Sequence, residues 1–215
     1  MAVLDRFTSS RLYQRIHRLF DHPSVFNAYQ ILVDGGKERR IRRFLEETYF
    51  ETVVDIGCGT GNWAITAKGS YLGVDVADEF IESARRRYAN DPSKRFLQLD
   101  PTSESLPGEY DLAQLVSVLH HLSDEQVDRL LERIVPRIRY LFVLDLYPIP
   151  WNPVARFLYA ADRGDHIREP ADQKRLILRN DQLEFVREDD YVAPSGVYRH
   201  TLMLFERRGT NSGPN

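Results

Sequence analysis

The stretch VVDIGCGTGNW, residues 53–63, is the part of the chain that points most directly to a fold. An apolar, β-branched run ends in three glycines on alternate positions, Gly57, Gly59 and Gly61. Glycine adopts positive φ angles easily and lets a ligand approach the main chain closely, because it has no Cβ. In an open α/β sheet, ligands bind beyond the carboxyl ends of the strands. The stretch therefore predicts a strand, a glycine loop and then a helix, which together form a ligand site.

Further apolar segments of strand length follow this stretch. Their continuous apolar character suits strands that are covered on both faces, as in a parallel sheet. The segments are SYLGVD (70–75), RFLQLD (95–100), YDLAQLVSV (110–118) and RYLFVLDL (139–146).

Helical patterns lie between these strands. Residues 78–90, DEFIESARRRYAN, carry an apolar stripe and end at Asn90, which we expect to stop the helix in a left-handed conformation. Residues 123–135, SDEQVDRLLERIV, open with a capping box formed by Ser123 and Gln126. Alternating strands and helices imply a sheet with helices on both faces.

The carboxyl-terminal part breaks this alternation. Residues 182–208, QLEFVREDDYVAPSGVYRHTLMLFERR, contain two strand patterns separated by Pro-Ser-Gly, with no helix after them. We therefore predict an α/β fold that ends in an antiparallel pair of strands.

Composition limits the classes of protein to consider. The chain has 215 residues, one cysteine and a formal net charge of −3. This length suits one domain with a sizeable core. A single cysteine forms no internal disulfide, and arginines interrupt the amino-terminal segment where a signal peptide would be apolar, so we expect a cytoplasmic protein. The longest apolar run, residues 140–151, is too short to span a bilayer, and a slightly acidic chain has no overall attraction for nucleic acid.

The spacing of the glycines and two acidic residues indicate the ligand. A dinucleotide-binding loop has the spacing G-x-G-x-x-G, whereas this chain has G-x-G-x-G, which disfavours a nicotinamide-dependent dehydrogenase. Asp75 ends the second strand, where a carboxylate can accept both hydroxyls of a ribose. Asp100 ends the third strand, where a carboxylate can accept from an adenine amino group. The expected ligand is an adenosine without phosphates.

Taken in order, the motifs VVDIGCGTGNW, YLGVDVAD, FLQLDP and YDLAQLVSVLHHL resemble those of the class I S-adenosylmethionine-dependent methyltransferases, over roughly residues 50–146. The resemblance implies a Rossmann-like sheet of seven strands whose last strand is antiparallel, with S-adenosylmethionine as the cofactor. It assigns the methionine part to the glycines and Asp55, and the ribose to Asp75. The remaining cofactor residues that it implies are Val76, Asp100, Pro101, Leu115 and Val116.

The amino-terminal segment shows a looser resemblance. Residues 26–47, FNAYQILVDGGKERRIRRFLEE, are similar to the leading helix of ubiquinone and menaquinone methyltransferases, whose polar residues line the mouth of the cofactor site, here Asn27. We predict a helical lid over residues 1–48, a methyltransferase domain over 49–208 and a flexible tail over 209–215. Residues 3–20 form a basic amphipathic pattern, which we interpret as part of the lid, although contact with a membrane surface or a lipid-like substrate stays open.

Methyl transfer from a sulfonium is a direct displacement that requires alignment and exclusion of water. A base helps if the accepting atom is a hydroxyl oxygen or an acidic carbon. His120 and His121 follow the fourth strand and have a suitable ordinary pKa. We expect one of them, with His121 favoured, to be that base, while the alternative is that both are structural.

The acceptor is expected to be a small molecule. Residues 147–181 read as an insertion that covers an acceptor pocket, with Tyr147, Trp151 and His166 as candidate contacts. The fourth strand lacks the N/D-P-P-aromatic motif of enzymes that methylate adenine in DNA, and we predict no metal site. Two alternatives stay open: a protein or RNA methyltransferase of the same fold, and a catalytically silent cofactor-binding protein that acts through a partner.

Overall fold

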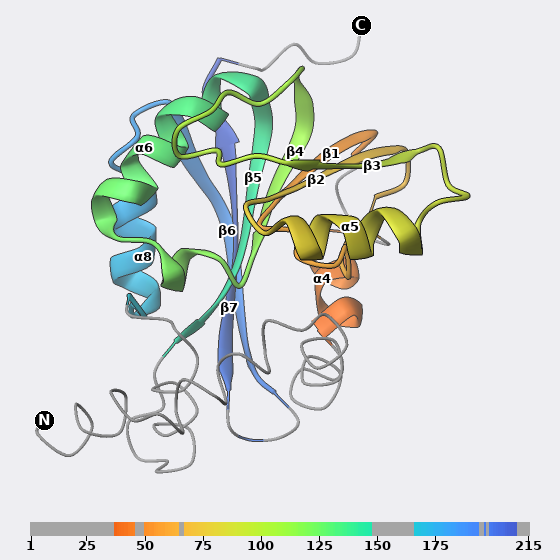
Figure 1. Cartoon of the computed structure of the whole chain (residues 1–215). Helices are drawn as coiled ribbons and strands as arrows, with labels where there is room; N and C mark the ends of the chain where they lie inside the picture. The colour runs from red at the N-terminus through yellow and green to blue at the C-terminus, as the bar shows by residue number, and fades with distance from the viewer. Residues whose placement is uncertain are drawn as a thin grey trace, which may run out of the picture.

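The computed structural model describes residues 37–45, 50–64, 67–147, 166–193, 196 and 198–209. Its strands form one sheet with the order β3-β2-β1-β4-β5-β7-β6 (Figure 1). Strands β1 to β5 run parallel, whereas β7 is antiparallel to both β5 and β6. The strands are β1 (Thr52–Ile56), β2 (Ser70–Asp75), β3 (Lys94–Gln98), β4 (Tyr110–Val116), β5 (Ile138–Tyr147), β6 (Leu183–Val192) and β7 (Arg199–Arg207). The predicted seven-stranded, Rossmann-like α/β fold with an antiparallel last strand is confirmed.

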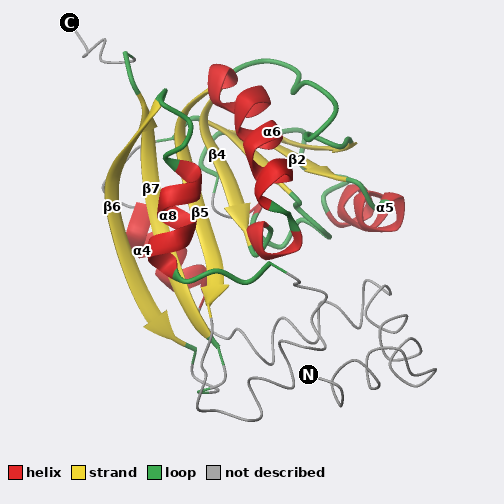
Figure 2. Cartoon of the chain, turned by 90° about the vertical axis from the view of Figure 1, so that its left-hand side faces the viewer, coloured by secondary structure: helices red, strands yellow, loops and turns green. Residues whose placement is uncertain are grey.

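Helices cover both faces of this sheet, as predicted (Figures 1 and 2). The face under α6 (Asp124–Ile134) and α8 (Pro170–Ile177) contains one apolar cluster, which includes Val54, Leu115 and Met203. The opposite face, under α4 (Lys37–Leu45) and α5 (Asp78–Arg87), contains a second cluster. Continuous apolar strands are explained by this arrangement, because both sides of each central strand are buried.

Local signals explain where α6 begins. Ser123 accepts a hydrogen bond from the main-chain nitrogen of Gln126, and the Gln126 side chain accepts one from the main-chain nitrogen of Ser123, so the predicted capping box is present. Pro136 lies in a 3₁₀ turn that follows the helix.

Two local expectations need correction. Asn90 does not stop α5 with a left-handed conformation, since Ser117 is the one described residue other than glycine with a positive φ. Residues 57–64 form turns instead of a regular helix after the glycine loop, because only residues 57–69 join β1 to β2. Within the predicted insertion 147–181, residues 170–177 form α8, which packs on the sheet through Leu176 and Ile177, and the covering of an acceptor pocket stays a prediction.

The order of the strands locates the ligand site. The chain passes from β1 outward to β2 and β3, and then returns to β4 on the other side of β1. The carboxyl ends of β1 and β4 therefore flank the topological switch point, where open α/β sheets bind ligands. The glycine loop follows β1 at this point. No helix in the described ranges is long and apolar enough to cross a membrane.

Candidate active site

The glycine loop has the conformation that its sequence requires. Gly57, Gly59 and Gly61 have φ angles of 70°, 52° and 76°, in the region that strongly favours glycine. A Cβ added to Gly57 would lie 2.8 Å from Cγ2 of Val118. The loop thus places a bare main chain beside the carboxyl end of β4.

Asp75, at the end of β2, holds this loop. Its Oδ2 accepts a hydrogen bond of 2.8 Å from the main-chain nitrogen of Gly59, and its Oδ1 accepts one of 2.9 Å from Ala77. The side chain is half-buried, so its remaining lone pairs lie at the edge of the site. This placement is compatible with the predicted contact to ribose hydroxyls.

Asp55 lies beneath the same loop and is 1% exposed. Burial raises the pKa of its carboxyl to about 7, although the hydroxyl of Tyr71 donates a 2.5 Å hydrogen bond to Oδ2 and opposes this rise. The Gln114 side chain also opposes this rise by hydrogen bonding to the carboxyl, and Oδ1 is buried from solvent. Asp55 therefore lies buried beneath the loop, and its contact with the amino group of the cofactor stays a prediction.

The predicted adenine side contains an exposed apolar residue. Val76 is 62% exposed directly after Asp75, and Pro101 is buried. Asp100 is already engaged in its own turn, because Oδ1 accepts from the nitrogen and hydroxyl of Thr102. These hydrogen bonds, that from the Thr102 hydroxyl foremost, lower the pKa of the Asp100 carboxyl. Asp100 thus shapes the turn, and only its remaining lone pairs are available to an adenine amino group.

A buried lysine, which sequence reasoning missed, lies beside Ser117, directly after β4, and near Trp63, which follows the glycine loop. Lys37, the first residue of α4, is 1% exposed, and its Nζ lies 3.0 Å from Oγ of Ser117 and 5.5 Å from the centre of the Trp63 ring. Ser117 has a φ of 60°, an uncommon conformation outside glycine. It follows Leu115 and Val116, which are buried at the end of β4. The ammonium group therefore lies where the predicted methionine part of the cofactor would end.

His120 and Asp145 form a buried pair. His120 is 3% exposed and Asp145 is 1% exposed, and the distance from Nδ1 to Oδ1 is 2.5 Å. The carboxylate also accepts from the main-chain nitrogens of His120 and Leu146. Burial alone would raise the pKa of Asp145, but the attraction of His120 and these hydrogen bonds outweigh it, so the pKa is lowered. Since a carboxylate only accepts, we assign the ring proton to Nδ1, which leaves the lone pair of a neutral ring on Nε2.

His121 differs from its neighbour. Its side chain is exposed, and its ring lies 4.0 Å from that of His120 between centroids. The oriented histidine is therefore His120, whereas the sequence favoured His121. Asp145 was the missing signal: it is the one carboxylate within the apolar run LFVLDLY of β5, although the sequence of β5 does not reveal which side chain it meets.

The predicted acceptor residues are only partly described. Tyr147, at the end of β5, is buried, and its hydroxyl donates a 2.9 Å hydrogen bond to Asp190. Burial, with Asp190 adding to it, raises the pKa of Tyr147 to about 12. His166 is half-buried, and its main-chain nitrogen donates to the carbonyl of His120 over 3.1 Å. Trp151 and Asn27 lie outside the described residues.

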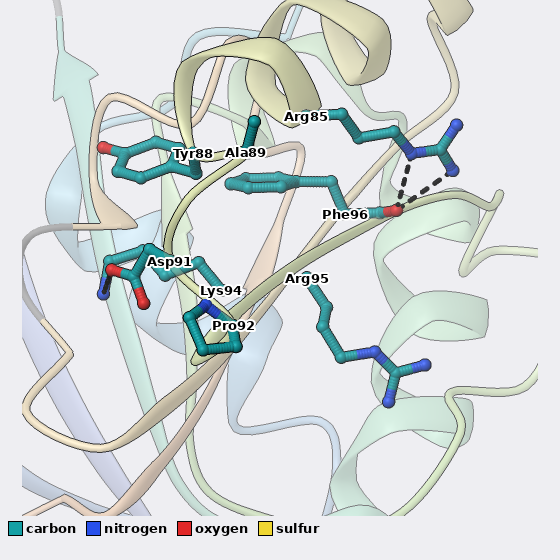
Figure 3. A pocket seen from close by; sticks show the side chains of 8 residues that line it. All are labelled: Arg85, Tyr88, Ala89, Asp91, Pro92, Lys94, Arg95 and Phe96. Carbon is teal, nitrogen blue, oxygen red and sulfur yellow. Dashed lines mark hydrogen bonds and ion pairs between the residues drawn. The ribbon is translucent and has the colours of Figure 1, made fainter.

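A surface hollow of about 360 Å³ lies elsewhere, beside the start of β3 (Figure 3). Its lining residues precede or begin β3, at the amino edge of the parallel sheet, and are Arg85, Tyr88, Ala89, Asp91, Pro92, Lys94, Arg95 and Phe96. The hollow is therefore not the cofactor site. In the described part of the chain, no three His, Cys, Asp or Glu residues are grouped to hold a metal ion.

Comparison with known proteins gives a family for the central segment. Residues 53–139 match the model of a methyltransferase domain family. A demethylmenaquinone methyltransferase from Symbiobacterium thermophilum is 30% identical over 97 residues. That alignment covers 40% of this chain and 39% of the relative, so the chain matches well under half of the curated protein.

Solved structures share the whole architecture at low identity. An N-methyltransferase, NodS, from Bradyrhizobium japonicum, solved with S-adenosylhomocysteine, has a TM-score of 0.68 at 17% identity and covers 93% of this chain and 100% of its own. The magnesium protoporphyrin IX methyltransferase of Synechocystis has a TM-score of 0.63 at 16% identity, with coverages of 96% and 99%. At such identities the likeness shows the fold. Residues 53–139 therefore match a methyltransferase domain family, and the chain shares the fold of these solved methyltransferases.

Proposed function

We propose that the chain is an enzyme that transfers a methyl group from S-adenosylmethionine to a small-molecule acceptor by direct displacement. The observation that carries this proposal is the glycine loop at the switch point, held by Asp75 in a segment that matches a methyltransferase domain. The sulfonium of the cofactor supplies an activated methyl group. The residues of the chain bind and orient the cofactor and the acceptor, and deprotonate the acceptor where it needs a base.

The residues present fit this cofactor. Gly57 exposes its main chain at the start of the glycine loop, and Asp75 would hold the ribose. Val76, 62% exposed, offers an apolar surface for the adenine. The carboxyl of Asp55, buried beneath the loop, suits the α-ammonium group, and the buried ammonium of Lys37 suits the α-carboxylate.

His120 is the residue we propose as the base. Asp145 holds the ring by Nδ1, so that Nε2 accepts the proton that the acceptor loses as its new bond to the methyl group forms. Asp145 stabilises the imidazolium that results. An acceptor that arrives as a neutral amine or a carboxylate needs alignment only.

The kind of acceptor has weaker support than the methyl transfer itself. The relatives are named for different acceptors, among them demethylmenaquinone and magnesium protoporphyrin IX, and for nitrogen or oxygen atoms. We therefore propose a small organic acceptor with one reactive nitrogen, oxygen or carbon. Tyr147 and His166 are proposed to line its site from the described residues. Trp151 stays a prediction for the acceptor site, and Asn27 stays one for the cofactor site.

Incubation with S-adenosylmethionine carrying a labelled methyl group tests this function. Purified protein would be given, in separate reactions, a metabolite extract, total RNA and a protein extract. We expect label in the small-molecule fraction. For an acceptor that needs a base, a hydroxyl or an acidic carbon, we expect little label from His120→Ala. Label in RNA or protein would overturn the proposed acceptor class, and no transfer to any pool by a protein that binds the cofactor would favour the catalytically silent alternative.

A further inference from the structure

The turn that carries His120 is fixed from two sides. On the side of the sheet, Asp145 accepts from the main-chain nitrogen and from Nδ1 of His120. On the other side, the turn meets the segment before α8, where the nitrogen of His166 donates to the carbonyl of His120. The second side depends largely on one further residue, Arg168.

The guanidinium of Arg168 joins three separate pieces of chain. Nη1 donates to the carbonyls of Leu119 (2.9 Å) and His166 (3.0 Å), and Nη2 donates to the carbonyl of Leu122 (2.7 Å). Nε and Nη2 also donate to Oδ1 of Asp124, at 3.0 and 2.8 Å. The Arg168 side chain is 10% exposed, so these bonds are shielded from water. Leu119 and Leu122 bracket both histidines in the chain.

These bonds are not needed to begin α6. That helix has its own cap, in which Ser123 and Gln126 satisfy each other's main-chain nitrogens. An arginine serving only to anchor the helix would need the pair with Asp124 and none of the three carbonyls. The carbonyl contacts act instead on the turn Leu119–His121, which presents His120.

We infer that Arg168 is a positioning residue that, through the turn, sets the place and the tautomer of the His120 ring. This inference rests on the proposed role of His120 as the base. A planar guanidinium donates in several fixed directions, and a lysine ammonium cannot reproduce them. Loss of Arg168 leaves three carbonyls and one carboxylate oxygen without this donor, and the turn then moves relative to Asp145.

Arg179 offers a matched control. It pairs with Oδ2 of the same Asp124 at 3.2 Å and also with Asp128, but it donates to no carbonyl of the turn. Arg179→Gln removes a positive charge from the same carboxylate and leaves the turn contacts in place. Arg168→Gln removes both the charge and the contacts with the turn. Arg168→Lys keeps the charge but loses the several fixed donors of the planar guanidinium.

The experiment is long-range ¹H–¹⁵N NMR of the histidine rings in the full chain, with thermal unfolding and S-adenosylhomocysteine affinity measured alongside. We expect wild type and Arg179→Gln to show His120 as one tautomer, with the proton on Nδ1. Arg168→Gln and Arg168→Lys should show a mixture of tautomers, with affinity for S-adenosylhomocysteine within about twofold of wild type. Once an acceptor is known, turnover should fall by roughly 10²-fold, as for a small misplacement of a reacting group.

An unchanged His120 spectrum in Arg168→Lys, with only a lower melting temperature, would overturn the inference and make Arg168 a purely structural residue. The same spectral change in Arg179→Gln would also overturn it, because the charge on Asp124 would then be the cause. Failure of wild type to bind S-adenosylhomocysteine would contradict the proposed function instead, because the ring spectrum is read without cofactor.

Discussion

Replacement of Asp145 by asparagine perturbs the pair on which the proposed chemistry depends. The carboxylate is 1% exposed and accepts three hydrogen bonds, from Nδ1 and the main chain of His120 and from the main chain of Leu146. An amide keeps one accepting oxygen and places an NH₂ group where the second stood, so at least one donor loses its partner. Leaving a buried donor without its charged acceptor costs about 1–3 kcal/mol.

This cost translates into a measurable change in melting temperature. For a chain of 215 residues, 1 kcal/mol lowers the melting temperature by about 2–4 °C. Asp145→Asn should therefore melt roughly 2–12 °C below wild type at pH 7. Since the pKa of Asp145 is lowered, its contribution is present above the ordinary value of 3.8 and is lost as the pH falls through the lower value of the folded state. The difference between the two proteins should persist from pH 7 to about 4 and close only below that.

Scanning calorimetry between pH 3 and 8 would follow the difference, with Asp189→Asn, an exposed aspartate of β6, as control. If His120 is the base, turnover should also fall by up to about 10²–10⁴-fold, while affinity for S-adenosylhomocysteine is kept. A variant that melts and turns over like wild type would refute the reasoning, because the buried pair would then contribute neither stability nor orientation.

Three further substitutions test the cofactor site. Asp75→Ala should weaken binding of S-adenosylhomocysteine roughly 10- to 150-fold, the equivalent of one charge-assisted hydrogen bond to ribose; calorimetry showing wild-type affinity would remove Asp75 from the site. Lys37→Met should weaken S-adenosylhomocysteine by a similar factor and leave methylthioadenosine, which lacks the α-carboxylate, nearly unchanged; equal losses for both ligands would exclude Lys37 as the carboxylate partner. Burial raises the pKa of Asp55 from 3.8 to about 7, so its carboxyl holds a proton in the folded state that it loses on unfolding. As the pH rises from 4 to 8, wild type should therefore lose about 4 kcal/mol of unfolding free energy relative to Asp55→Asn. Urea unfolding in which the difference between the two proteins is constant with pH would contradict the raised pKa.

The sequence was informative wherever structure is local. Apolar strand patterns, the capping box of Ser123 and Gln126, and the glycines at positive φ all follow from short segments whose chemistry permits one conformation. Asn90 was predicted wrongly because a residue that tolerates a left-handed conformation does not need to adopt it. The missing helix after the glycine loop is explained by the short connection, residues 57–69, which the motif alone does not reveal.

The site was less predictable than the fold because its decisive contacts join distant positions. Lys37 meets Ser117 across 80 positions, and Asp145 meets His120 across 25. Neither pairing can be read from a local pattern, because each depends on where β4 and β5 end relative to their neighbours. The sequence placed both histidines correctly near the end of β4, but only the register of the sheet shows that Asp145 orients His120.

Titration calorimetry of the wild-type chain with S-adenosylhomocysteine and, separately, with a nicotinamide dinucleotide tests the central claim most directly. The account predicts one S-adenosylhomocysteine bound per chain and no heat from the dinucleotide, because the glycine loop with Asp75 suits an adenosine without phosphates. Binding of the dinucleotide in place of S-adenosylhomocysteine, or binding of neither, would contradict it.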